Sequence, residues 1–175
     1  NENTELYLKS YYGLSKFISE RILEKTAKEL GIKLIIFRIP LVYGVGDSTK
    51  GYGPSDFINS FIDNRPITLW GKGDEYREFI YISDIVKLTY KFLDNNSEGI
   101  FNIVSGKSYT FFTIIKILNK IFSKKYKINY KKRSKKKVDH KFNNKKILKF
   151  LHGYKFHTLE EGIVEFLKSY EKKNK

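Results

Sequence analysis

Hydrophobic residues recur at helical spacing near the start of the chain and then gather into short uninterrupted runs. Residues 7–30 follow the period of an amphipathic helix, and Gly31 stands where a helix commonly ends. Later apolar runs are bounded by Gly, Pro, Asp or Ser, which is typical of buried strands. These runs predict strands at residues 33–37, 67–70, 78–82 and 100–104.

Helices are predicted between the strands. Ser55, Asp84 and Thr110 are expected to be the N-cap residues of helices that reach about residues 62, 93 and 122. A further strand is predicted at 126–130, and a capping box that begins at Thr158 starts the last helix. Strands that alternate with helices predict an α/β fold with a parallel sheet.

The composition excludes several classes of protein. The 175 residues contain no cysteine, so disulfides and thiolate metal sites are absent, and the three histidines lack the spacing of zinc ligands. We therefore predict no metal site. No apolar run is long enough to cross a membrane, and no signal peptide is recognisable, so a cytoplasmic protein without a membrane partner is expected. The chain lacks methionine and enters a helix almost at once, which suggests the C-terminal part of a longer protein.

The net charge of +15 is concentrated in one segment. Fifteen Lys or Arg residues and one acid, Asp139, lie between residues 116 and 149, and residues 131–137 are the densest stretch. Such a run fits a patch for nucleic acid or another polyanion, or a solvated loop in a lysine-rich sequence. The second interpretation is favoured because Lys replaces Arg throughout the chain. We therefore predict no nucleic-acid partner.

Tyr12 and Lys16 lie four residues apart within the first predicted helix, so their side chains project from one face. A phenol has a reference pKa near 10, and an adjacent ammonium favours the phenolate. Such a pair can act as a general acid and base. The same spacing also arises by chance in a chain rich in Tyr and Lys, in which case both are ordinary exposed helix residues.

Four segments that follow one another along the chain favour the catalytic interpretation of this pair over chance. They are Tyr12-Gly-Leu-Ser-Lys16, Phe37-Arg-Ile-Pro-Leu-Val-Tyr-Gly44, Trp70-Gly-Lys-Gly73 with residues 76–84, and Phe101-Asn-Ile-Val-Ser-Gly106. This series resembles the C-terminal half of the extended short-chain dehydrogenase/reductase family. The similarity is greatest to its NAD-dependent nucleotide-sugar epimerases and dehydratases, and it covers nearly the whole chain.

The resemblance implies a role for particular residues. Tyr12 takes the place of the catalytic tyrosine, and Lys16 that of the lysine which binds the nicotinamide ribose and lowers the tyrosine pKa. The peptide from Pro40 to Val42 takes the place of the strand end that borders the nicotinamide, so all of these residues are expected to bind the cofactor. Arg77 is expected to bind the substrate diphosphate, although an ion pair with a neighbouring Glu is also compatible with the sequence. Tyr43 is expected to line the substrate pocket or to pack beneath it.

The resemblance also implies an architecture, the later part of a Rossmann-type parallel sheet interleaved with a small α/β substrate-binding domain. Residues 1–46 and 78–104 would belong to the first domain, and residues 47–77 and 105–175 to the second. Two departures are visible. Leu41 stands where many epimerases have Asn, and no Gly-x-Gly-x-x-Gly turn for the cofactor pyrophosphate occurs in the chain.

The activity implied is that of an NAD-dependent epimerase that transiently oxidises a hydroxyl of a nucleotide-diphosphate sugar. NADP in place of NAD, and a homodimer, stay open. The alternatives are a 4,6-dehydratase, a keto-sugar reductase or, in a different class, a basic noncatalytic module that binds polyanions. Since the pyrophosphate turn is not in these residues, we expect the isolated chain to be inactive and to bind NAD in the millimolar range or not at all.

Overall fold

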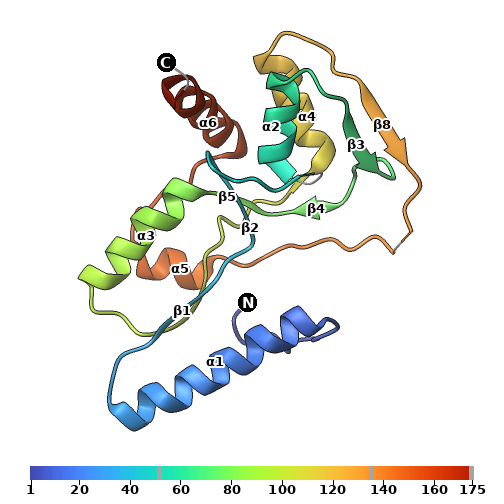
Figure 1. Cartoon of the computed structure of the whole chain (residues 1–175). Coiled ribbons are helices and arrows are strands. Elements are labelled where there is room, and N and C mark those ends of the chain that lie inside the picture. Colours follow the sequence, from blue (N-terminus) through green and yellow to red (C-terminus); the bar gives the residue numbers. More distant parts are fainter. Residues whose placement is uncertain (51–52, 135, 174–175) are drawn as a thin grey trace.

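A computed structural model describes residues 1–50, 53–134 and 136–173. The helices are α1 (Tyr11–Leu30), α2 (Gly53–Ile62), α3 (Ile82–Asp94), α4 (Phe111–Ile121), α5 (Lys145–Phe150) and α6 (Leu159–Lys173). The strands are β1 (Ile35–Arg38), β2 (Leu41–Tyr43), β3 (Ile67–Trp70), β4 (Tyr76–Arg77), β5 (Phe79–Tyr81), β6 (Gly99–Asn102), β7 (Tyr109–Thr110) and β8 (Ile128–Lys131). Figure 1 shows α2, α4 and α6 grouped at the top, α3 and α5 below them, and α1 apart at the bottom.

The described strands form four pairs. Strand β1 runs parallel to β6, β2 to β5 and β3 to β8, whereas β4 and β7 are antiparallel. In the first pair Phe37 lies opposite Phe101, so the two strands place aromatic rings at the same level. The prediction of an α/β fold with parallel strands is confirmed.

Two clusters of buried side chains hold the body together. The larger joins α2, α4 and α6 to β2, β3 and β5, and it centres on Ile58, Ile114, Leu118, Ile163 and Phe166. The smaller joins α3 and α5 to β6; its buried members are Leu88, Phe92, Phe101, Ile103, Ile147 and Leu151. In the described part of the chain, α1 contributes no residue to either cluster.

Several predicted helix ends are confirmed, and others lie at different residues in the structure. Gly31 ends α1 in the left-handed conformation, with φ of 64°, as its position in the sequence predicts. The helix begins at Tyr11 rather than near residue 7, because Ser10 caps it by accepting the N–H of Gly13 at 3.0 Å. Thr110 caps α4 as predicted, and Thr158 forms the predicted capping box before α6.

Two predicted caps are wrong. Ser55 lies inside α2, and its hydroxyl instead accepts the N–H of Gly44 at 3.3 Å. Asp84 lies in the first turn of α3 and is buried. Its carboxylate accepts hydrogen bonds from the hydroxyl of Tyr154 at 2.7 Å and from the backbone N–H of His157 at 3.0 Å, and one oxygen lies 2.9 Å from the His157 Nδ1. Asp84 therefore fastens the segment before α6 to α3.

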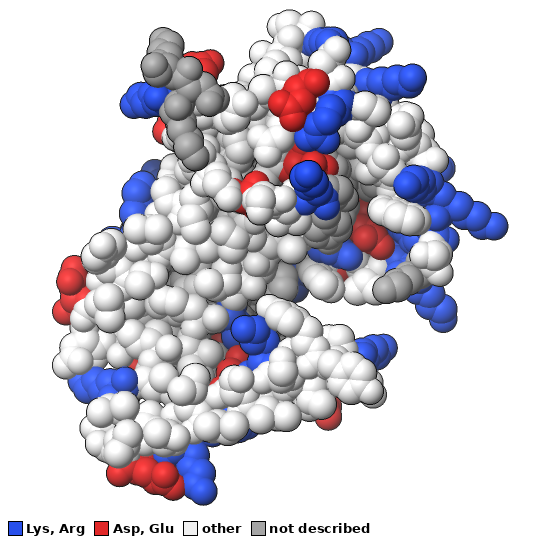
Figure 2. All heavy atoms as spheres, in the orientation of Figure 1, with Lys and Arg blue, Asp and Glu red and all other residues white. Residues whose placement is uncertain are grey.

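The charge is spread unevenly over the surface. Figure 2 shows Lys and Arg side chains gathered at the upper right, over β3, β8 and the neighbouring coil, while the arm formed by α1 is largely uncharged on this face. Residues 51–52, and residue 135 of the basic run 131–137, lie outside the described residues. No helix among the described residues is long and apolar enough to cross a membrane.

Candidate functional site

Tyr12 and Lys16 occupy the first two turns of α1, as the helical spacing predicts. The ammonium of Lys16 lies 5.6 Å from the centre of the Tyr12 ring. Tyr12 is 73% exposed, and Lys16 is exposed as well. The two side chains therefore share one face of the helix, adjacent to each other and open to a ligand.

An ion pair fastens α1 to the end of β1. The guanidinium of Arg38 donates two hydrogen bonds to the carboxylate of Glu20, at 3.0 Å from Nε and 2.6 Å from Nη2. It also donates to the backbone carbonyl of Glu2 at 3.2 Å. The hydrogen bond from Arg38 lowers the pKa of Glu20, and the same contact raises the pKa of Arg38. Arg38 thus holds the neighbouring segments in place.

The peptide after β1 borders an open depression. Val42 is 37% exposed and lines it together with Tyr43, and its volume is about 340 Å³. The other residues that line this depression are Gly44, Val45, Gly46, Asp47 and Ile82. Pro40, just upstream, is partly buried between β1 and β2.

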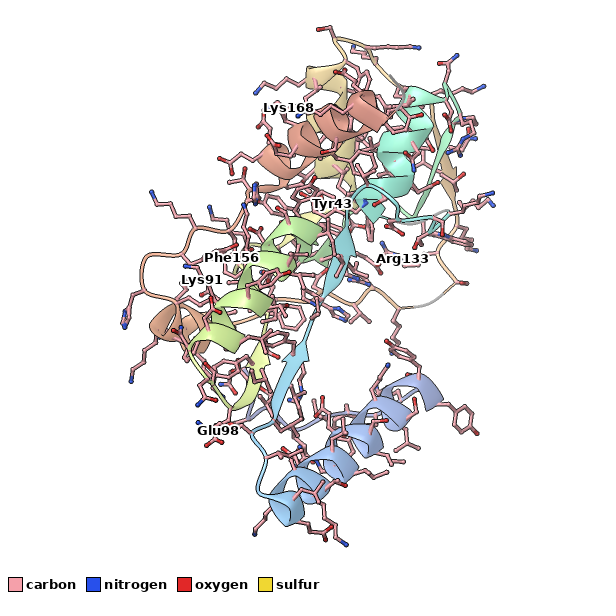
Figure 3. All side chains as sticks on the ribbon, turned by 60° about the vertical axis from the view of Figure 1, so that its left-hand side comes forward. Tyr43, Lys91, Glu98, Arg133, Phe156 and Lys168 are labelled. Atoms are coloured by element: carbon pink, nitrogen blue, oxygen red, sulfur yellow. The ribbon has the colours of Figure 1, made fainter. Side chains whose placement is uncertain are left out.

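Tyr43 packs beneath this depression in the larger cluster of buried side chains. Its ring is 1% exposed, and its hydroxyl donates to the carbonyl of Leu159 at 3.4 Å. Burial raises the pKa of Tyr43, so its hydroxyl stays protonated. Figure 3 shows Tyr43 near the middle of the body. Packing beneath the pocket, one of the two roles that the sequence allows, is the role that this placement favours.

Arg77 lies in β4 and is held by several acceptors. Its guanidinium donates to Glu75 at 3.1 Å, to the carbonyl of Tyr76 at 2.9 Å, and to the carbonyl of Val138. Its side chain is 13% exposed. The ion pair with a neighbouring Glu, which the sequence also allows, is therefore present.

Arg133 is a nearby cation that sequence reasoning missed as an individual residue. Its Nη2 lies 2.9 Å from Asp74, and its Nε lies 3.6 Å from Glu75, the same carboxylate that Arg77 contacts. The only sequence signal was the basic run 131–137, which does not distinguish one member from another. The structure shows instead that Arg133 folds back over the turn that precedes β4.

Comparison with known proteins places this geometry in context. A dTDP-4-dehydro-6-deoxyglucose reductase of Escherichia coli is 37% identical over 134 residues, which cover 74% of this chain and 42% of the reductase. The matched part of the chain therefore spans less than half the length of this relative.

Solved structures resemble the chain over almost all of its length. A dTDP-glucose 4,6-dehydratase from Bacillus anthracis in complex with NAD matches with a TM-score of 0.83 at 21% identity, over 98% of this chain and 55% of that one. A UDP-glucuronic acid 4-epimerase from Bacillus cereus, in complex with UDP-glucuronic acid and NAD, matches with a TM-score of 0.83 at 24% identity. This match covers 100% of this chain and 56% of the epimerase. At these identities the likeness shows the fold, and it confirms the predicted Rossmann-type α/β class.

The family is shown by the sequence. The profile of the NAD dependent epimerase/dehydratase family matches residues 1–104, which include Tyr12, Lys16 and Arg77. Because this match covers more than half of the chain, the chain belongs to the NAD dependent epimerase/dehydratase family.

Proposed function

We propose that the protein carrying this chain is an NAD-dependent epimerase of a nucleotide-diphosphate sugar. The observation that carries the proposal is the Tyr12–Lys16 pair, adjacent and exposed on α1. The family match supports an enzyme rather than a noncatalytic polyanion-binding module. A 4,6-dehydratase and a keto-sugar reductase are the alternatives, because relatives with both of these names resemble the chain.

The residues present fit part of a nicotinamide cofactor. An ammonium suits the ribose hydroxyls, and Lys16 presents one at the exposed face of α1. The peptide from Pro40 to Val42 would border the nicotinamide, beside the depression at the end of β2. When bound, NAD supplies a hydride acceptor and donor. None of these residues distinguishes NAD from NADP.

The side chains of this chain would handle the proton and the substrate charge. The Tyr12 hydroxyl would exchange a proton with a sugar hydroxyl, and the ammonium of Lys16 lies beside it on the same face of α1. The guanidinium of Arg77 offers a planar pair of donors to the phosphate oxygens of the nucleotide sugar. Tyr43 supports the floor of the depression without titrating.

The domain division follows as part of the same proposal. Residues 1–46 and 78–104 would present the cofactor side, and residues 47–77 and 105–175 would present the substrate side. Specificity for the nucleotide and sugar would reside in the second set, because the hydride chemistry is common to the family while the substrates differ. A homodimer stays a prediction.

The test is the loss of the Tyr12 hydroxyl. In the protein carrying this chain, Tyr12→Phe should lower turnover of UDP-glucose, UDP-glucuronic acid or dTDP-glucose by about 10² or more, the usual scale for removal of a general acid or base. Tyr11→Phe is the matched control, since Tyr11 immediately precedes Tyr12 in the same helix and is 93% exposed. Product sugars separated by chromatography and identified by NMR would distinguish epimerisation from dehydration or reduction. Equal turnover in the two variants would remove Tyr12 from the catalytic role.

A further inference from the structure

One carboxylate is shared by two arginines at the start of β4. The Oε2 of Glu75 lies 3.1 Å from Nη2 of Arg77, and its Oε1 lies 3.6 Å from Nε of Arg133. The side chains are 13%, 19% and 21% exposed for Arg77, Glu75 and Arg133. Two guanidinium groups from distant parts of the sequence therefore converge on Glu75, and Arg133 also donates from Nη2 to Asp74 at 2.9 Å.

The hydrogen bonding of this cluster is incomplete. Among the described residues, Nε of Arg133 is buried and has no hydrogen-bond partner, because Glu75 Oε1 is too distant and accepts instead from the N–H of Val138 at 3.4 Å. A buried donor without a partner destabilises the state that contains it. Figure 3 shows Arg133 at the edge of the body, beside the coil that follows β8. A larger anion with more oxygens could accept from Arg77 and also from Nε of Arg133, which Glu75 does not satisfy.

We propose that Glu75 is a resident anion that competes with the substrate diphosphate for Arg77 and Arg133. This inference rests on the proposed function, since it takes the diphosphate of a nucleotide sugar as the ligand. In the ligand-free protein the carboxylate reduces the repulsion between the two cations. A diphosphate carries more charge and more acceptor oxygens, so it displaces the Glu75 side chain and pairs with the guanidinium groups.

The position of Glu75 in the chain is compatible with such a movement. It lies in the turn between β3 and β4, after Gly73, and belongs to neither a helix nor a strand. A side chain there can rotate away without breaking a backbone ladder. The consequence is selectivity, because a ligand with a single phosphate offers fewer oxygens with which to replace the carboxylate.

A different role for Glu75 predicts the opposite result. If Glu75 only positions Arg77, then its removal releases the guanidinium from its binding position and weakens the affinity for phosphate. If Glu75 competes, then its removal strengthens that affinity. The sign of the change in affinity therefore distinguishes the two roles.

The experiment is a calorimetric titration of UDP into the protein carrying this chain. Glu75→Gln should bind UDP about three- to tenfold more tightly than the wild type, the scale of a partly exposed ion pair. Glu165→Gln, which removes the same charge from an exposed pair with Lys168 at 2.9 Å, should bind UDP with unchanged affinity. Arg133→Ala should weaken UDP binding. The affinity for UMP should rise by a larger factor than the affinity for UDP in Glu75→Gln, because UMP competes less well than UDP with the Glu75 carboxylate.

Three outcomes are informative. Tighter UDP binding by both Glu75→Gln and Glu75→Ala supports the inference, and the second variant covers the case in which the amide remains bonded to an arginine. Weaker or unchanged binding by both, with thermal unfolding like that of the wild type, overturns the inference while leaving the proposed function standing. Failure of the wild type to bind UDP, dTDP and their sugars contradicts the inference and the proposed function together.

Discussion

Helix α1 and helix α4 illustrate two ways in which this chain uses a helix. In α4, Phe111, Ile114, Ile115 and Leu118 are all buried. In α1, which is longer, Ala27 is the one buried residue, and apolar side chains such as Ile22 remain more than half exposed. The body of the protein is therefore stabilised by apolar packing, whereas α1 buries little apolar surface and is joined to β1 by the ion pair between Glu20 and Arg38.

The comparison shows that stability and candidate chemistry reside in different regions. Tyr12 and Lys16 lie on the least packed helix, where both side chains are exposed. Arg77 lies next to the well-packed β5, whose residues are all buried. Figure 1 shows the same division, with α1 set apart from the body that contains β4 and β5. Within these 175 residues, substitutions in α1 should therefore leave the packing of the body unchanged.

The largest difference in the free energy of unfolding should come from truncating a leucine to alanine in α4 and in α1. Leu118→Ala in α4 removes a side chain that is 0% exposed, and it should reduce the free energy of unfolding by about 2–5 kcal/mol. Leu23→Ala in α1 removes one that is 51% exposed, and it should change that free energy by less than about 0.5 kcal/mol. Denaturant unfolding followed by circular dichroism measures both. Equal losses would mean that α1 is packed as tightly as the body.

A methyl group added to α6 should have the next largest effect. A Cβ at Gly162 would lie 1.9 Å from the hydroxyl oxygen of Tyr43 and 2.9 Å from its ring. Gly162→Ala should therefore destabilise the protein by about 1–3 kcal/mol, although alanine favours the helix itself. Tyr43→Phe in the same protein removes the closest atom and should restore part of the loss. A fully additive double mutant would show that the two residues are not in contact.

The sequence predicts those features of the fold that depend on neighbours in the chain. The αL ending of α1 at Gly31 and the caps at Thr110 and Thr158 involve residues within one or two turns, so their pattern is sufficient. Asp84 has the same local pattern as Thr110, yet it bonds to Tyr154 and His157, far along the chain. A side chain that can cap a helix can instead accept hydrogen bonds from donors far along the chain. Local spacing does not show which of these bonds forms.

The candidate site divides in the same way. The Tyr12–Lys16 pair is visible in the sequence because a helix brings residues four apart to one face. The contact of Arg133 with Glu75 is not visible, since it depends on how the coil after β8 returns to the turn before β4. Trp70 lies at the end of a predicted strand, yet it is 50% exposed, and the ammonium of Lys131 lies 5.8 Å from the centre of its ring.

The smallest predicted effect concerns the ion pair that holds α1. Glu20→Gln removes the charge that Arg38 contacts at 2.6 Å, and it should weaken the attachment of α1 by about 1–2 kcal/mol, the range for charged hydrogen bonds that are partly exposed. Glu29→Gln is the matched control, because Glu29 pairs with Lys25 within the same helix at 3.7 Å. Hydrogen exchange of the α1 amides should increase in the first variant and remain near the wild-type rate in the second.

Acid should reproduce the effect of Glu20→Gln in the wild type. Arg38 lowers the pKa of Glu20 below its ordinary value of 4.5, so the folded protein binds this proton less readily than the unfolded chain does. The pair therefore contributes its full stability above pH of about 4.5, and the contribution is lost as the pH falls through the lowered pKa. Exchange in α1 should rise over that range in the wild type, after correction for the intrinsic rate, and should stay level in Glu20→Gln. The same rise in both proteins would show that other groups, and not this pair, hold α1 against β1.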